Sequence, residues 1–319
     1  MDITYIEHLI APRLEKDVHD YFTQVRFGAS VPRIKNLDHS KNQQQEWLEV
    51  FFDYFADWNF LIYSQREYEL SFWIDIFRDA YFYVLSQLNP NLRYFLPDMT
   101  HTPKWMIEQI LEKLKILFKT TGFNEYLNHY NDQYVKRINH IRESYIQVSK
   151  FSVDAPDLKF YLSFLPETER LYSINWVIRA FRAFEKKLKN QTWFSGHVIF
   201  TYYHLIRDSY RNCYVIRFYL TFQKVFYSTY TNYSALIQQL WQEVTEGFGT
   251  LLSVDDEKSN QPFGNPFGLD SDQVLPFSEP QNPLDDLDHL PEVATGISEN
   301  MNKICIVPTG FKVFHGKKW

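Results

Sequence analysis

Hydrophobic residues recur at helical spacing through the first half of the chain. In REYELSFWIDIFRDAYFYVLSQL, residues 66–88, the apolar positions fall three and four residues apart, which is the period of an α-helix. The run before it, QEWLEVFFDYFADWNFLIY, is equally rich in aromatic residues. Aromatic stripes of this kind are typical of core packing. A third helix is predicted to begin at Thr102-Pro103 and a fourth to cover residues 123–150. Residues 1–150 are therefore expected to form a mostly helical, aromatic-rich region.

The pattern changes at residue 157, where DLKFYLSFL alternates with the period of two that a strand shows. An amphipathic helix is predicted over residues 173–190, two strands over 197–207 and 213–222, and a helix over 233–247. The glycines of GFGT, residues 247–250, indicate a turn. KICIVPTGFKVFHG, residues 303–316, is predicted to return to the sheet as a strand or hairpin. The order predicts an α+β domain with an antiparallel sheet.

The second half therefore divides in two by its pattern. Residues 151–251 and 298–319 are expected to form the α+β domain. Between them, residues 252–297 hold six prolines, many acids and few large apolar residues, which is typical of a loop or an acidic insertion.

Charge is distributed unevenly along the chain. The net charge of −6 argues against a protein that coats nucleic acid indiscriminately. Residues 176–224, however, hold nine lysines and arginines against two acids, and residues 251–297 hold ten acids against one lysine. Such asymmetry indicates an electrostatic partner. Seven cations are candidate phosphate contacts, and three tyrosines are candidates for base stacking: Arg179, Arg182, Lys186, Lys187, Lys189, Arg211 and Arg217, with Tyr202, Tyr203 and Tyr219.

Several other classes of protein are disfavoured by the sequence. No run of about 18 uncharged apolar residues is present, so a membrane span is not expected. The first residues carry acids and lack the apolar core of a secretory signal. Cys213 and Cys305 both lie in apolar runs and have no zinc-site spacing, so buried free thiols in a reducing, cytoplasmic setting are expected.

The order of elements from about residue 135 onward resembles the inovirus-type replication protein family of the YagK/YfjJ kind, itself similar to the HUH rolling-circle initiators of phages and plasmids. RINHIRESYIQVSKF and DLKFYLSFL resemble its entry helix and first strand, and HVIFTYYHLIR its second strand. CYVIRFYLTF resembles the strand that bears the histidine pair, and LIQQLWQEVTEGFG a helix end with Trp241. NMNKICIVPTGFKVFHG is similar to the closing segment. The resemblance implies an HUH-like, ferredoxin-like sheet that binds DNA.

The chain departs from that family at the residues that carry its chemistry. Nicking requires a divalent cation, which two histidines at i and i+2 hold on one face of a strand. Here Val215 and Arg217 take those places. All 22 tyrosines precede residue 234, so no later tyrosine can serve as the nucleophile. His197 and His204 are seven residues apart, which places them on opposite faces of a regular strand.

These departures predict a DNA-binding protein with no catalytic residue, no metal ligand and no cofactor. Two alternatives remain open. One is a divergent nickase, which would use a divalent metal. The other is a regulatory protein whose helical region binds a protein partner and whose acidic insertion mimics or occludes nucleic acid.

Overall fold

In the computed structural model, the described residues are 3–28, 43–65, 68–149, 157–165, 172–208, 213–226, 231–252 and 304–319. The chain divides into two compact units. The helical unit comprises Met1–Asp132 with Cys305–Thr309, and the sheet unit comprises Gln133–Ile304 with Gly310–Trp319. The boundary thus falls inside a helix rather than at residue 150, and the closing segment is divided between the units. Residues 253–303, which hold nearly all of the predicted acidic insertion, lie outside the described residues.

The helical unit follows the predicted aromatic stripes, with two differences. Its helices and strands are α1 (Ile3–Tyr5), a π-helical turn (Ile6–Ile10), α2 (Ala11–Phe27), α3 (Gln43–Phe52), α4 (Phe55–Ser64), β1 (Tyr68–Leu70), α5 (Phe72–Leu88), α6 (Pro103–Phe118), the start of α7 (Thr121–Ser149) and β6 (Ile306–Pro308). The first aromatic run is split into α3 and α4, and the second begins as the short strand β1, which pairs antiparallel with β6. Thr102 caps α6, as predicted, by accepting a hydrogen bond from the Trp105 amide.

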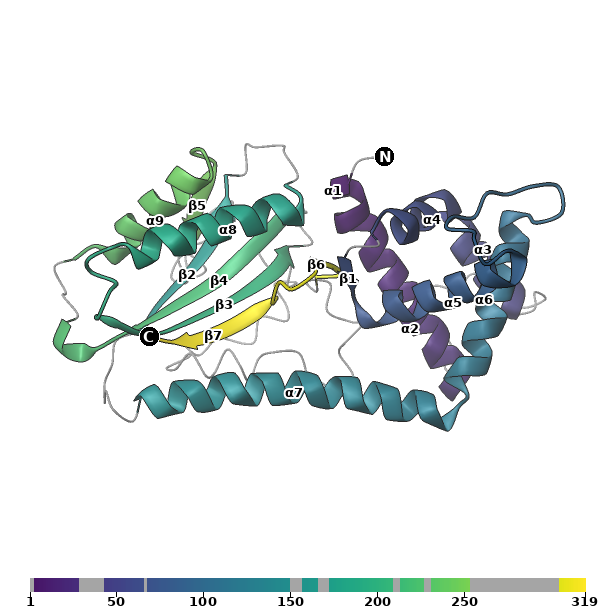
Figure 1. Ribbon diagram of the computed structural model, residues 1–319, viewed down its shortest axis with the longest axis horizontal. Coiled ribbons are helices and arrows are strands. Elements are labelled where there is room, and N and C mark those ends of the chain that lie inside the picture. Colours follow the sequence, from purple (N-terminus) through teal and green to yellow (C-terminus); the bar gives the residue numbers. More distant parts are fainter. Residues whose placement is uncertain are drawn as a thin grey trace, which may run out of the picture. The chain divides into compact units, whose positions relative to one another are not determined.

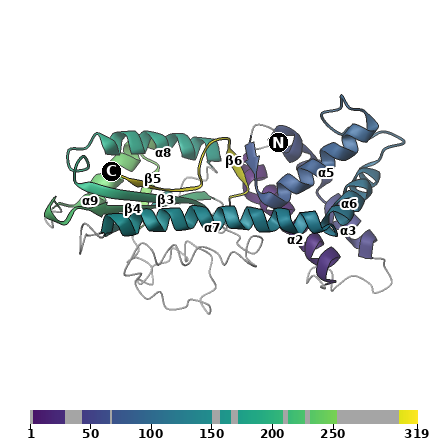
Figure 2. The same ribbon diagram turned by 60° about the horizontal axis from the view of Figure 1, so that its bottom comes forward.

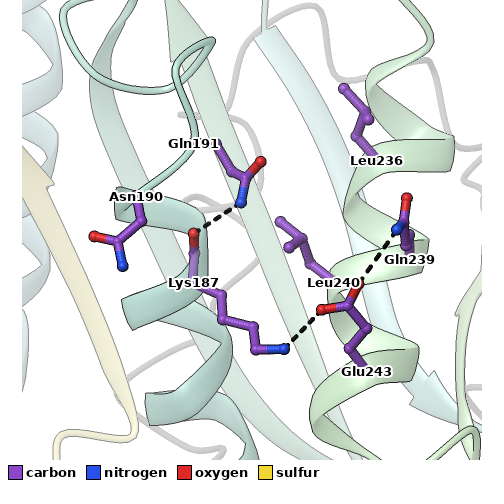
Figure 3. Close-up of a pocket in the computed structure, with 7 residues that line it drawn as sticks. All are labelled: Lys187, Asn190, Gln191, Leu236, Gln239, Leu240 and Glu243. Carbon is purple, nitrogen blue, oxygen red and sulfur yellow. Dashed lines mark hydrogen bonds and ion pairs between the residues drawn. The ribbon is translucent and has the colours of Figure 1, made fainter.

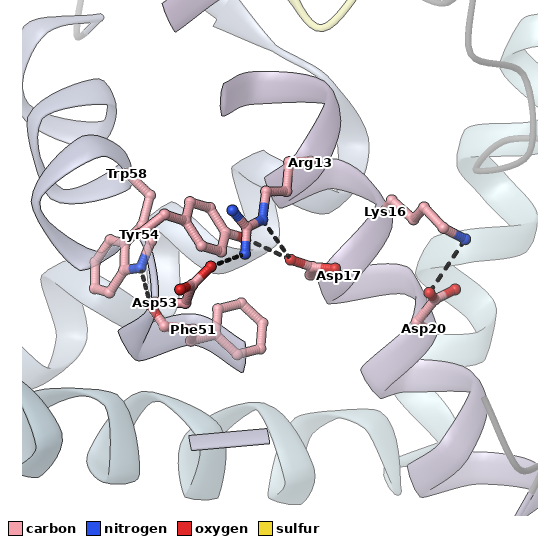
Figure 4. A network of polar contacts seen from close by, with 8 residues as sticks. All are labelled: Arg13, Lys16, Asp17, Asp20, Phe51, Asp53, Tyr54 and Trp58. Atoms are coloured by element: carbon pink, nitrogen blue, oxygen red, sulfur yellow. Dashed lines mark hydrogen bonds and ion pairs between the residues drawn. The ribbon is translucent and has the colours of Figure 1, made fainter. Parts of the chain in front are cut away.

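A polar network joins α2 to the junction of α3 and α4 (Figure 4). The Arg13 guanidinium lies 2.5 Å from the Asp53 carboxylate and 3.9 Å from the centre of the Tyr54 ring. The Tyr54 hydroxyl donates to Asp17, whose side chain is buried. A buried carboxylate needs such partners, and this network supplies them. We therefore assign these charges a structural role in the helical unit.

The sheet unit contains one five-stranded antiparallel sheet, which confirms the α+β class. Its elements are the end of α7, β2 (Asp157–Phe164), α8 (Ile174–Lys189), β3 (Val198–Asp208), β4 (Cys213–Phe222), a 3₁₀ turn (Lys224–Phe226), α9 (Tyr233–Val244), β5 (Gly249–Leu252) and β7 (Phe314–Lys318). The strand order is β5-β2-β4-β3-β7. Strand β5 was not predicted, because the glycines of GFGT, residues 247–250, indicate a turn at this place.

Helices cover both faces of this sheet (Figures 1 and 2). On one face, α8 packs Phe181 against Tyr203 and Phe184 against Phe218, with ring centres 4.7 and 5.5 Å apart. On the opposite face, the α7 residues Ile138, Ile141 and Tyr145 form a buried cluster with side chains of β3, β4 and β7. The half of α7 that belongs to this unit is therefore part of its core. Among the described residues, no helix is both long and apolar enough to span a membrane.

Gly316 on β7 allows α7 to approach the sheet closely. A Cβ atom at this position would lie 2.7 Å from Ile141 Cγ2 and 3.0 Å from Phe200 Cζ. We predict that Gly316→Ala lowers the free energy of unfolding by about 1–3 kcal/mol, because both neighbours are buried and must shift. Urea denaturation followed by circular dichroism measures the loss.

Gly122→Ala is the matched control for this variant. Gly122 lies in α7, with no atom within 4 Å of an added Cβ and no positive φ. Alanine there should be neutral or stabilising, because it is the better helix former. Equal unfolding midpoints for the two variants would show that α7 does not pack on the sheet as described.

Candidate nucleic-acid interface

Helix α8 carries five of the seven predicted phosphate contacts on its exposed side. The helix begins after Ser173, whose side chain accepts a hydrogen bond from the Trp176 amide. Its apolar residues are buried against the sheet, and the five cations are exposed: Arg179, Arg182, Lys186, Lys187 and Lys189. An amphipathic helix buries one face and leaves the other to solvent. The sequence therefore placed these five side chains correctly on one exposed surface.

Lys187 differs from the other four because its ammonium group has a carboxylate partner. It lies 2.6 Å from Glu243 on α9, and Gln239 donates to the same carboxylate (Figure 3). The hydrogen bond from Lys187 lowers the pKa of Glu243. These residues line a cavity of about 380 Å³ together with Asn190, Gln191, Leu236 and Leu240. Lys187 therefore bridges α8 and α9, which makes it a weaker candidate for a phosphate contact.

Beside α8, the edge strand β7 contributes further charge and an aromatic ring. Lys189 Nζ lies 5.1 Å and Lys317 Nζ 3.8 Å from the centre of the Trp319 ring. Arg182 lies 5.8 Å from the centre of the Phe311 ring. We call the residues Arg182, Glu185, Lys189, Lys317 and Trp319 the α8–β7 surface.

Glu185 is the one acid of the α8–β7 surface, and its pKa is raised. Burial is the main cause, and it outweighs the opposing effect of Lys189, Lys317 and Arg182, which favour the charged form. Three cations around one carboxylate leave the α8–β7 surface net positive even when Glu185 is ionised. This surface therefore keeps an attraction for anions at neutral pH.

Of the remaining two predicted cations, the structure describes only Arg217, which does not join this surface. Arg217 lies half-buried on the sheet face opposite α8, in register with Tyr161 of β2 and His204 of β3. Its guanidinium carbon is 5.8 Å from the centre of the Tyr161 ring. Arg211 lies outside the described residues. The predicted set of seven cations is thus divided between two faces of the sheet, with one member not described.

The three tyrosines proposed for base stacking lie in the core, which corrects that prediction. Tyr202 and Tyr219 are 4% and 2% exposed and belong to the cluster under α7, with their rings 5.5 Å apart. Tyr203 packs against Phe181 of α8 on the other face. A base must reach an exposed ring face in order to stack. None of the three rings offers one.

Val215 and Arg217 of β4, where the resemblance would place a histidine pair, are an apolar and a cationic residue. Val215 is fully buried in a cluster with Tyr161 and Ile206. His204 lies beside Arg217, and burial, together with that arginine, lowers the pKa of His204 to about 3. His197 precedes β3 and stacks on Phe226 at 4.8 Å. Within the described residues, no group of three or more histidine, cysteine or acidic side chains is arranged to hold a metal ion.

Neither cysteine forms a disulfide bond in the structure. Cys305 is buried, as expected, whereas Cys213 at the start of β4 is only half-buried.

The described residues of the two units differ in charge. Among them, the sheet unit holds fifteen lysines and arginines against six acids, whereas the helical unit holds nine against sixteen. Over its full length the sheet unit holds equal numbers, 20 of each, because residues 253–303 are rich in acids. An anionic partner would be attracted to the described part of the sheet unit and repelled by the helical unit.

Sequence reasoning missed Lys317 and Trp319 as site residues. The only signal was the last four letters of the sequence, GKKW, in which a tryptophan follows two lysines. Their proximity to α8 depends on β7 pairing with β3, which places Lys317 opposite Thr201. This pairing joins residues more than 100 positions apart.

Compared with known proteins, the chain matches no family model, no curated protein and no solved structure. The resemblance to replication initiators therefore depends on the order of elements and on the hydrophobic pattern alone.

Proposed function

We propose that the sheet unit binds nucleic acid through its lysines and arginines and does not nick it. The observation that carries the proposal is the exposed row of cations on α8, within a unit whose described residues are strongly basic. Phosphate contacts by such residues provide most of the affinity of proteins for nucleic acid. DNA is the ligand that we infer, since the resemblance is to proteins that initiate DNA replication.

The order of elements from β2 to β5 supports the same proposal. Along the chain the elements run strand, helix, strand, strand, helix, strand, and in the sheet the four strands lie in the order β5-β2-β4-β3. This order supports a ferredoxin-like sheet, the kind of sheet on which the HUH initiators are built. The replacement of the histidine pair by Val215 and Arg217 favours binding without metal-dependent cleavage. We therefore place the protein among initiator-like DNA-binding proteins that have lost nicking.

Binding should weaken steeply as salt rises. If the five cations of α8 contact phosphates, the slope of log K against log salt should be about −3.5 to −4.5. A fourfold rise in salt would then lower the affinity about 100- to 500-fold. Fluorescence anisotropy with a labelled oligonucleotide, at two salt concentrations, measures this change.

The same titration includes a divalent-metal control. Adding magnesium or manganese at constant ionic strength should not strengthen binding, because divalent cations compete with the protein for the phosphates, and should produce no cleaved product on a denaturing gel. An affinity that does not respond to salt would refute phosphate binding. A cleaved product that appears only with metal would replace the proposal with the nickase alternative.

A further inference from the structure

Trp319 is a large exposed ring held in a fixed orientation beside the lysines of the α8–β7 surface. Its side chain is 43% exposed. The indole nitrogen donates to Thr201 Oγ1 at 2.9 Å, and the Phe194 ring contacts it edge-on, with centres 5.1 Å apart. The Trp319 amide also donates to the Ile199 carbonyl. The Trp319 backbone and indole nitrogen are thus hydrogen-bonded to β3, and Phe194 contacts the ring. Because the ring is already held in place, little conformational entropy would be lost when a ligand stacks on the ring.

Two lysines flank the exposed part of this ring. Lys317 Nζ lies 3.8 Å from the ring centre and Lys189 Nζ lies 5.1 Å from it. A cation over an exposed indole contributes little, because its ammonium group stays hydrated. Lys317 can therefore leave the ring at small cost and bind a phosphate beside it. The ring would then be open to a planar ligand.

An indole with two ammonium groups beside it matches the chemistry of one unpaired nucleotide, which has a planar base and flanking phosphates. We infer that the sheet unit prefers single-stranded nucleic acid, with one base stacked on Trp319 and the flanking phosphates bound by Lys189 and Lys317. This inference depends on the proposed function and specifies its ligand. The α8 cations would follow the phosphates of the same strand, since Lys189 belongs to both groups.

A duplex presents the same phosphates but keeps its bases paired and stacked. It can therefore use the cations of α8 without using Trp319. Base stacking on an aromatic residue does not depend on sequence, because every base has a π-face. The inference thus predicts a preference for single strands with little preference among sequences.

The test measures the affinity for a labelled oligothymidylate of about 15 nucleotides and for a duplex of the same length. This length is within the site size of such surfaces. Trp319→Ala should weaken single-strand binding about tenfold and change duplex binding less than about twofold. Trp319→Phe should retain most of the affinity, because it keeps a ring. Lys189→Gln combined with Lys317→Gln should make the salt slope shallower by about 2.

Phe226→Ala is the matched control, since Phe226 is 46% exposed in the same unit and lies outside the α8–β7 surface. Equal effects of Trp319→Ala and Phe226→Ala on single-strand affinity would overturn the inference. So would salt-dependent binding that is equal for both ligands and unchanged by Trp319→Ala, although the proposed function would stand. Absence of binding to either ligand at low salt would overturn the proposed function and this inference with it.

Discussion

Replacing Trp241 with alanine is expected to lower the free energy of unfolding of the sheet unit by about 3–5 kcal/mol. Trp241 is fully buried on α9, between Phe164 of β2 and Phe184 of α8, with ring centres 5.6 and 5.8 Å away. Its indole nitrogen also donates to the Ser163 carbonyl at 2.7 Å. Alanine would leave a cavity at the point where two helices meet the sheet. Because domains are typically stable by only about 5–15 kcal/mol, this loss is expected to remove a large part of the stability.

Urea denaturation monitored by far-UV circular dichroism measures this effect. Trp241→Phe should cost less than Trp241→Ala, because it keeps a ring in the cavity and loses the hydrogen bond. Trp105→Ala is the matched control, since Trp105 is only half-buried, on α6 of the helical unit. A Trp241→Ala protein with an unchanged midpoint would contradict the packing of α9 on the sheet.

Trp241 also shows what the sequence could not predict about β5. A Cβ atom on Gly249 would lie 2.5 Å from Trp241 Cδ1 and would also clash with Thr245 Oγ1. The glycine therefore starts a strand that passes directly over the indole. Two residues earlier, Gly247 has a φ of +88° and does form a turn. From the sequence, the two glycines indicate a turn, and nothing indicates the strand that follows it. A strand of four residues is too short for its period to identify it.

Periodicity was reliable where an element was long and amphipathic. It predicted α6, α8, β3 and β4, and it identified the side of α8 that carries exposed cations. Periodicity did not show that the three tyrosines proposed for base stacking are buried. A period of two shows which residues share a face of a sheet but not whether a helix covers that face. Tyr202 and Tyr219 share a face, as the pattern predicts, and α7 covers it.

Among the proposed variants, reversing two charges on α8 is expected to have the largest effect on the affinity for nucleic acid. Arg179 and Lys186 are exposed, and neither belongs to the α8–β7 surface or to the bridge with Glu243. Arg179→Glu combined with Lys186→Glu would remove two of the proposed phosphate contacts and add repulsion. Affinity at low salt should fall more than about a hundredfold, and the salt slope should become shallower by about 2. The fold should tolerate the change, since exposed substitutions usually alter stability by less than about 0.5 kcal/mol.

A change of four charge units could weaken binding to a polyanion wherever it was made, so the control must match it. Lys104→Glu combined with Lys119→Glu makes the same change at exposed positions of α6 and its end, in the acidic helical unit. If binding depends on local contacts with α8, this control should lower the affinity only slightly, and the small loss should vanish at high salt. Equal losses in the two double variants would mean that long-range attraction, rather than α8, accounts for the binding. The row of cations on α8 would then be only a solvated helix face.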